Sequence, residues 1–137
     1  MYKKIMVSLS LEHGIADRAL EVARHLLAEG GKILAVHVYE QPNPSVSAYL
    51  DQEVLAQAYA DAKDRLKARV KDATDVKPVL LKGHSGATIT EYAASAGVDL
   101  IIVGSHKPGL SDYFLGSIAA RIVRHAPCSV HVLRDDD

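Results

Sequence analysis

The sequence predicts an α/β fold: a single doubly wound domain over residues 1–137, with a five-stranded parallel sheet and helices on both faces. Three observations lead to this prediction. Short apolar runs alternate with segments of helical periodicity, in the order β-α-β-α-β-α-β-α-β. Within the runs, apolar and polar residues hardly alternate, which is typical of strands buried on both faces. The length of 137 residues suits one domain with a sizeable core.

The first strand is predicted at residues 3–10, where Ile5, Met6 and Val7 form a continuous apolar centre. A helix follows, with apolar residues at helical spacing between residues 15 and 27, and Gly30 and Gly31 are expected to stop it. Residues 32–39 predict the second strand. Residues 41–49 contain two prolines and two serines and predict a loop.

The longest helix is predicted at about residues 48–71. Its charged side is expected to be a solvated surface, and its apolar side repeats at four-residue intervals, namely Leu50, Val54, Ala58, Ala62, Leu66 and Val70. Residues 76–83 predict the third strand. Because Pro78 cannot donate a ladder hydrogen bond, we expect this strand at an edge of the sheet, or paired only through its second half.

The last part of the chain adds two helices and two strands. Ser85 is expected to cap a helix that ends before Gly97. Residues 98–104 predict the fourth strand, which is the most buried by pattern. Residues 117–124 predict a helix that Pro127 stops, and residues 129–134 predict the fifth strand.

Composition excludes several classes of protein. Charged residues make up 24% of the chain and the formal net charge is -1, so no basic excess points to nucleic acid or to an anionic membrane. The single cysteine, Cys128, excludes an intrachain disulfide and fits a small apolar residue in a reducing compartment. No signal peptide is recognised and no stretch approaches the roughly 20 apolar residues of a membrane helix. We therefore expect a cytoplasmic protein.

Catalytic and metal-binding patterns are not found in the sequence. The seven histidines come from separate predicted elements, and no H-x-x-x-H pair occurs, so we expect no metal site. The hydrolase pattern G-x-S-x-G is missing as well, and Ser85 in "GHSG" fits a helix cap better than a nucleophile. We therefore expect no catalytic residues.

The loop after the fourth predicted strand is the best candidate for a binding site. In an open parallel sheet, ligands bind beyond the carboxyl ends of the strands. Gly104 is expected to allow backbone angles closed to other residues, and Gly116 leaves room for a phosphate beside the next helix. His106 and Lys107 offer positive charge.

The start of the last helix supplies hydrogen-bond donors to this loop. The amides of Ser117, Ile118 and Ala119 lack intrahelical acceptors, and together with the helix dipole they favour an anion by about 0.3–2 kcal/mol. The residues alone leave an alternative open, in which Ser117 is an ordinary helix cap and the glycines are turn residues. The loop matches neither the G-x-G-x-x-G fingerprint nor a P-loop.

Three segments carry a resemblance to a known family: "YKKIMVSLS", "GVDLIIVGSH" and "LGSIAARIVRHAPCSVHVLR". Over its whole length the chain resembles the universal stress proteins of the UspA family. ATP-binding members carry G-x-x-G, nine residues, then G-[ST]. Gly104 matches the first glycine and Gly116 and Ser117 match the closing pair, whereas Lys107 replaces the second glycine and the loop is one residue shorter. "GSHKP" is similar to the G-S-H-x-P variant of some small bacterial members.

The resemblance implies that an adenine nucleotide, ATP or AMP with or without Mg²⁺, binds at the carboxyl edge of the sheet. It places Val38 against the adenine through its backbone. The family often reads P-V-D at the end of the first strand, with the aspartate contacting the adenosine, where this chain has Ser8 and Ser10. The residues that it places along the phosphates are Gly104, Ser105, His106, Lys107, Pro108, Gly116, Ser117, Ile118 and Ala119.

Two functional hypotheses follow. The first is a cytoplasmic stress-response protein, a dimeric regulatory module that binds adenine nucleotide and at most hydrolyses ATP or phosphorylates itself slowly, because no side chain stands out as a general base. The alternative is a nucleotide-free dimeric interaction protein with a purely structural loop. In both, the dimer forms through the C-terminal strand, where Val130 and Val132 share one face. The resemblance implies antiparallel pairing of this strand with its twofold mate.

Overall fold

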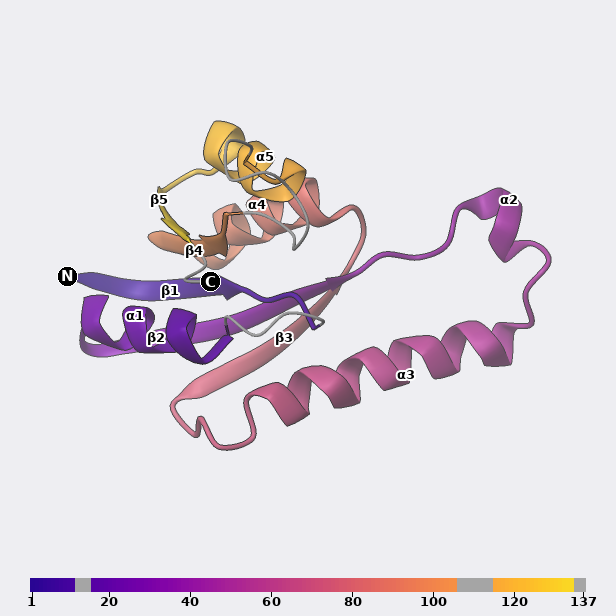
Figure 1. Ribbon diagram of the computed structural model, residues 1–137, viewed down its shortest axis with the longest axis horizontal. Coiled ribbons are helices and arrows are strands. Elements are labelled where there is room, and N and C mark those ends of the chain that lie inside the picture. Colours follow the sequence, from indigo (N-terminus) through magenta and orange to yellow (C-terminus); the bar gives the residue numbers. More distant parts are fainter. Residues whose placement is uncertain (12–15, 106–114, 135–137) are drawn as a thin grey trace.

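The computed structural model describes residues 1–11, 16–105 and 115–134, which form a parallel sheet of five strands in the order β3-β2-β1-β4-β5 (Figure 1). The predicted fold class is confirmed. The strands are β1 (Tyr2–Ser8), β2 (Leu27–Tyr39), β3 (Val76–Lys82), β4 (Leu100–Gly104) and β5 (Ser129–Leu133). The helices are α1 (Ala16–Leu26), α2 (Pro44–Ser47), α3 (Gln52–Arg69), α4 (Ser85–Ala96) and α5 (Ser117–His125).

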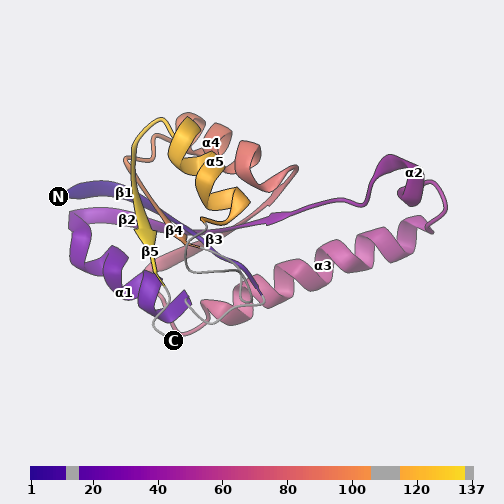
Figure 2. The same ribbon diagram turned by 45° about the horizontal axis from the view of Figure 1, so that its top comes forward.

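Helices cover both faces of the sheet (Figures 1 and 2). α1 and α3 pack on the face that carries Ile5 and Val7, and α4 and α5 pack on the face that carries Met6. Because successive side chains of a strand point to opposite faces, the continuous apolar runs fill two cores at once. Ile5, Met6 and Val7 are fully buried, as their place at the centre of the first apolar run predicts.

The two edges of the sheet are formed by the strands that the sequence places there. β3 lies at one edge, which confirms the edge prediction. Its Pro78 pairs in register with Ala35 of β2 and the pairing begins at Val76, so the alternative that only the second half of the strand pairs is wrong. β5 lies at the other edge and pairs on its inner side with β4. A proline at an edge leaves the rest of the sheet's hydrogen bonds intact.

The boundary between α1 and β2 differs from the prediction. α1 ends at Leu26, before the two glycines, and β2 begins at once with Leu27. Leu27 pairs with Tyr2, but the next pair is Lys4 with Lys32, so residues 28–31 bulge out of the ladder. Gly30 has φ +78° within this bulge, a value that glycine adopts without strain. The two glycines therefore form part of the bulge and do not end the helix.

The predicted loop after β2 contains a short helix, α2. Pro44 occupies its first turn, and the side chain of Asn43 accepts a hydrogen bond from the Ser45 N–H at 3.0 Å. The long helix begins later than predicted, at Gln52, with Asp51 as its cap. Both changes come from local capping residues that break the apolar period.

Half of the apolar stripe of the long helix is exposed. Ala62, Leu66 and Val70 are buried, whereas Leu50 and Val54 are exposed. Figure 1 shows the reason: the N-terminal part of α3, together with α2, projects beyond the sheet. The apolar side identified from the sequence is therefore buried only in its second half.

Ser85 is not the cap of α4, contrary to the sequence prediction. It is the first residue of the helix, His84 precedes it, and the His84 side chain makes no capping bond. The end of α4 agrees with the prediction, because Gly97 adopts the left-handed conformation with φ 71° and ψ 33°.

Asp99 ties the beginning of β1 to the beginning of β4. Its carboxylate accepts hydrogen bonds from the backbone N–H groups of Lys3 and Lys4, both at 2.9 Å. Lys4 also donates its ammonium group to the Ala96 carbonyl at 2.7 Å. Burial opposes the charged form of Asp99, but the two backbone N–H donors outweigh it and lower the pKa of the carboxyl group.

We expect Asp99→Asn to lower the free energy of unfolding by about 1 kcal/mol at pH 7, because an amide oxygen accepts more weakly than a carboxylate. A lowered folded-state pKa stabilises the fold above the unfolded pKa, and this contribution is lost as the pH falls through the folded value. Urea unfolding of both proteins should therefore show a difference at pH 7 that shrinks below about pH 4. Asp72→Asn, at an exposed turn, serves as the control, and a pH-independent difference would contradict the assignment.

Candidate functional site

The strand order places a candidate site at the carboxyl ends of β1 and β4. From β1 the chain adds β2 and β3 on one side of the sheet and β4 and β5 on the other. At such a switch point the connections leave in opposite directions and open a crevice between the two central strands. Val7 pairs with Ile102, so Ser8 and Gly104 end their strands at the same edge.

Ser105 connects β5 to the start of α5. Its N–H donates to the Leu133 carbonyl at 2.9 Å, and its own carbonyl accepts from the Gly116 N–H at 2.7 Å. The residue is only 3% exposed. The peptide groups of one buried residue therefore fix where the last helix begins.

The first turn of α5 presents backbone donors at this edge. The first intrahelical bond runs from the Ala120 N–H to the Gly116 carbonyl at 2.8 Å, so the amides of Ser117, Ile118 and Ala119 precede the helical ladder. Gly116 caps the helix without a side chain. Within residues 1–11, 16–105 and 115–134, no acceptor bonds to these three amides.

The neighbouring helix α4 is different, because its N-terminus already holds a carboxylate. The N–H and the hydroxyl of Ser85 both donate to Glu40 Oε1, at 3.0 and 2.7 Å. Glu40 follows β2 directly, so a side chain from another element supplies the negative charge that a helix N-terminus favours. Sequence reasoning missed Glu40, since the bond spans 45 residues of chain.

The ends of β1 and β2 form the other wall of the crevice. Beyond β1, the Leu9 N–H donates to the Val36 carbonyl at 2.8 Å. Backbone groups of alternate residues point the same way, so the N–H and carbonyl of Val38 also point toward β1, at a level where β1 has ended. The side chain of Val38 is buried on the face covered by α4 and α5. Ser10 is exposed beside this edge.

Two arginines of α3 hold the segment that follows β1. Arg65 and Arg69 both donate to the Leu11 carbonyl, at 3.2 and 2.8 Å. Nδ1 of His37 lies 2.9 Å from the Leu9 carbonyl, and because a carbonyl only accepts, this nitrogen carries the proton. The sequence assigned the arginines to a solvated face. Their four-residue spacing places them on one side of α3, but nothing local identifies their acceptor.

The candidate residues divide into two groups. The structure brings Ser8, Ser10, Val38, Gly104 and Ser105 to the carboxyl edge, along with residues 116–119 of the last helix. His106, Lys107 and Pro108 lie outside the described residues. The expectation for the backbone of Gly104 is wrong: it ends β4 in register with Leu133, and the positive-φ glycines of the described chain are Gly30, Gly83 and Gly97.

A model of the universal stress protein family matches residues 1–134. The chain belongs to this family. A universal stress protein of Thermus aquaticus is 30% identical over 140 residues, which cover 98% of this chain and all of the relative. Universal stress protein G of Shigella flexneri is 28% identical over 142 residues, with the same coverage.

Solved structures share the fold of this universal stress protein over its whole length. The hypothetical protein MJ0577 matches with a TM-score of 0.81 and 26% identity, covering 100% of this chain and 99% of that one. UspA of Lactobacillus plantarum matches with a TM-score of 0.76 and 26% identity, covering 97% and 98%.

Two more distant structures with this fold were solved with nucleotides. One is a universal stress protein of Archaeoglobus fulgidus in complex with dAMP, 19% identical with a TM-score of 0.60 and covering 96% and 97% of the two chains. The other is a family member of Arabidopsis thaliana with AMP bound, 19% identical with a TM-score of 0.62 and covering 98% and 92%. At this identity the similarity shows a common fold.

Other kinds of site find no support in the described parts of this family member. These residues contain no group of three or more His, Cys, Asp or Glu side chains placed to hold a metal ion. Among the same residues, no helix is both long and apolar enough to cross a membrane. Cys128 is partly exposed, and burial together with the charge of Asp99 raises the pKa of its thiol. A raised pKa keeps the thiol protonated, which disfavours a nucleophilic role.

We expect Arg69→Met to loosen the segment after β1, because the 2.8 Å bond to the Leu11 carbonyl is lost while the apolar stem of the side chain is kept. Hydrogen exchange of the Leu9 amide should become roughly tenfold faster. Lys67→Met on the same helix removes a charge without touching Leu11 and should leave this exchange rate unchanged. Equal exchange in wild type and Arg69→Met would show that the arginine does not hold the segment.

Proposed function

We propose that the protein binds an adenine nucleotide, ATP or AMP, in the crevice between β1 and β4, and acts in the cytoplasm as a regulatory module of the stress response. The observation that carries the proposal is the first turn of α5. Three successive backbone N–H groups, those of Ser117, Ile118 and Ala119, lie at the switch point of the sheet without a described acceptor. Phosphate oxygens are suitable acceptors for such a set.

The crevice also offers contacts for the rest of a nucleotide. The phosphates lie at α5, and the adenine meets the backbone N–H and carbonyl of Val38, which point toward the end of β1. The ribose then lies near Ser8 and Ser10. The family members of Archaeoglobus fulgidus and Arabidopsis thaliana bind dAMP and AMP, which supports an adenine nucleotide as the ligand.

The loop after β4 completes the phosphate site in this proposal. Ser105, His106, Lys107 and Pro108 line the path of the phosphates, and the Lys107 ammonium offsets their charge. Mg²⁺ accompanies ATP through the phosphate oxygens. The carboxylate of Glu40, which follows β2, accepts two hydrogen bonds from Ser85 at the start of α4. We therefore do not assign Glu40 as a general base for hydrolysis. We therefore propose a binding module in which any turnover is slow.

Two departures from the family pattern favour the alternative of a nucleotide-free interaction protein: Lys107 stands in place of the second glycine, and Ser10 stands in place of an aspartate. Ser10 is shorter than the aspartate that the family often carries there, and it has no charge. The loss of one charged contact weakens nucleoside binding, whereas the donors at α5 remain. We therefore place nucleotide binding first, and direct measurement of bound nucleotide distinguishes the two.

The proposed module is a homodimer that pairs through β5. The Leu133 carbonyl accepts from Ser105 on the β4 side, so the alternation of the strand points the backbone groups of Val130 and Val132 toward the open edge. The side chains of these two valines are half-buried against the core beneath α5. An edge strand whose outward backbone groups bond to none of the described residues favours pairing with a second copy.

We expect protein denatured directly after purification to release AMP or ATP on nucleotide chromatography. ATP should also bind wild type in calorimetric titration, and Gly116→Val should bind it about tenfold or more weakly, because the branched side chain obstructs the approach of phosphate to the amides. Gly116 has φ -57° and ψ 152°, which valine can adopt without strain.

Thermal melting shows whether each variant is folded. Ser117→Val, at an exposed position, replaces the hydroxyl beside the same amides and should also weaken binding if Gly116→Val proves unstable. Ser95→Val, on the exposed side of α4, is the matched control and should bind like wild type. A folded Gly116→Val protein with wild-type affinity would exclude α5 as the phosphate site.

Val130→Pro should convert the dimer to a monomer, as measured by sedimentation equilibrium. Proline removes an N–H that points to the open edge, so the bonds between β4 and β5 persist while pairing with a second copy is blocked. Val130→Asp would be harder to interpret, because the charged side chain would also lie against the core and could destabilise the fold itself. A folded Val130→Pro dimer would show that the subunits meet elsewhere.

A further inference from the structure

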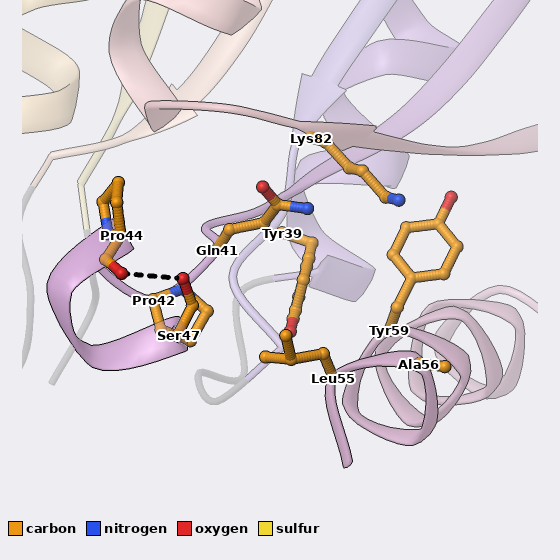
Figure 3. A pocket seen from close by; sticks show the side chains of 9 residues that line it. All are labelled: Tyr39, Gln41, Pro42, Pro44, Ser47, Leu55, Ala56, Tyr59 and Lys82. Carbon is orange, nitrogen blue, oxygen red and sulfur yellow. Dashed lines mark hydrogen bonds between the residues drawn. The ribbon is translucent and has the colours of Figure 1, made fainter. Parts of the chain in front are cut away.

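A cleft of about 340 Å³ lies at the carboxyl ends of β2 and β3, on the face covered by α3 (Figure 3). Tyr39 and Lys82 are the last residues of these two strands and pair in register. Tyr59 reaches the cleft from α3, and α2 closes the opposite side with Pro44. This volume is at the lower end of the range for small-molecule sites.

The cleft is separate from the crevice proposed for the nucleotide. That crevice lies between β1 and β4, whereas the cleft lies at β2 and β3, toward the other edge of the sheet. The two also use opposite faces: Val38 packs beneath α4 and α5, and Tyr39, the next residue, packs on the α1 and α3 side. A ligand in the cleft therefore meets different residues.

The aromatic wall of the cleft is held in place by its own contacts. The rings of Tyr39 and Tyr59 meet edge to face, with centroids 5.6 Å apart and planes at 80°. The Lys82 ammonium lies 4.3 Å from the centre of the Tyr59 ring, a cation–π distance. No ion pair joins Lys82 to a carboxylate of the described residues, so its charge is not neutralised by them.

The opposite wall is fixed by local structure. Pro42 and Pro44 restrict the backbone between β2 and α2, and Asn43 accepts hydrogen bonds from the N–H and the hydroxyl of Ser45 at 3.0 and 2.9 Å. The Ser47 hydroxyl donates to the Pro44 carbonyl at 3.2 Å. A cleft whose walls are ordered before binding costs a ligand little in conformational entropy.

From these features we infer that the cleft is a second ligand site, which takes a small planar aromatic carboxylate. The ring of the ligand packs among the tyrosines and prolines that line the cleft. Its carboxylate pairs with the Lys82 ammonium. A neutral aromatic molecule fills the same space but leaves the lysine charge unpaired and binds more weakly.

The test uses indole-3-carboxylate as the probe and indole-3-carboxamide as its neutral match. Titration followed by backbone NMR should shift the amides of Tyr39, Tyr59 and Lys82, with the carboxylate about tenfold tighter than the amide. Lys82→Met should remove this preference, and Lys77→Met, exposed on the same strand, should keep it. Equal affinity of both probes for wild type would overturn the inference.

A second variant tests the location. Ala56 lines the cleft from the exposed side of α3, so Ala56→Phe should fill the space and abolish binding of both probes without disturbing the core. Ala58→Phe, exposed on a different side of the helix, should bind like wild type. Saturating AMP should leave probe affinity unchanged. Displacement of the probe by AMP, or wild-type binding in Ala56→Phe, would contradict a separate site at this cleft.

Discussion

The two hydrogen bonds of the Ser105 peptide groups are the constraint on which the candidate site depends. One holds the end of β5 and the other holds Gly116, so a residue that is 3% exposed links the last strand to the start of the last helix. Together with the burial of Ala119 and Ile122, the bond to Gly116 places the first turn of α5 at the switch point. The same link joins the open edge of β5, where we propose that two subunits meet, to the donors that we propose for phosphate.

The two helices of this face differ at their N-termini, because among the described residues a carboxylate occupies the start of α4 and no side chain caps the start of α5. At α4 the chain provides its own anion, because Glu40 follows β2 and accepts from both donors of Ser85. At α5 the capping residue is a glycine, which has no side chain to accept a bond. Both helices start at the carboxyl edge of the sheet, so the difference comes from residue type and not from fold.

The features that could be predicted from the sequence are those fixed by residues close together in the chain. Apolar runs identify the strands. Pro78 identifies β3 as an edge strand, because proline has no N–H to donate to a neighbouring strand, and this holds whatever the rest of the chain does. The bond of Glu40 to Ser85 and the bonds of Arg65 and Arg69 to Leu11 span 45, 54 and 58 residues, and no local pattern contains them. The carboxyl edge of the sheet was predictable as the location of a site, since the alternation of strands and helices implies a parallel sheet. The strand order that opens the crevice and the residues that hold it in place were not predictable.

The arm formed by α2 and the start of α3 is stabilised by local contacts, whereas the sheet and its helices are stabilised by burial in the two cores. Leu50, just before α3, and Val54, in its first turn, are exposed, so burial of these side chains does not stabilise the arm. The caps at Asn43 and Asp51 and the ring contact between Tyr39 and Tyr59 take its place. Segments stabilised by few buried contacts open at lower free energy than core strands. The cleft at Lys82 thus has one wall on the sheet and one on an arm held by local hydrogen bonds, whereas the crevice at β1 and β4 is built on the most buried strands of the protein.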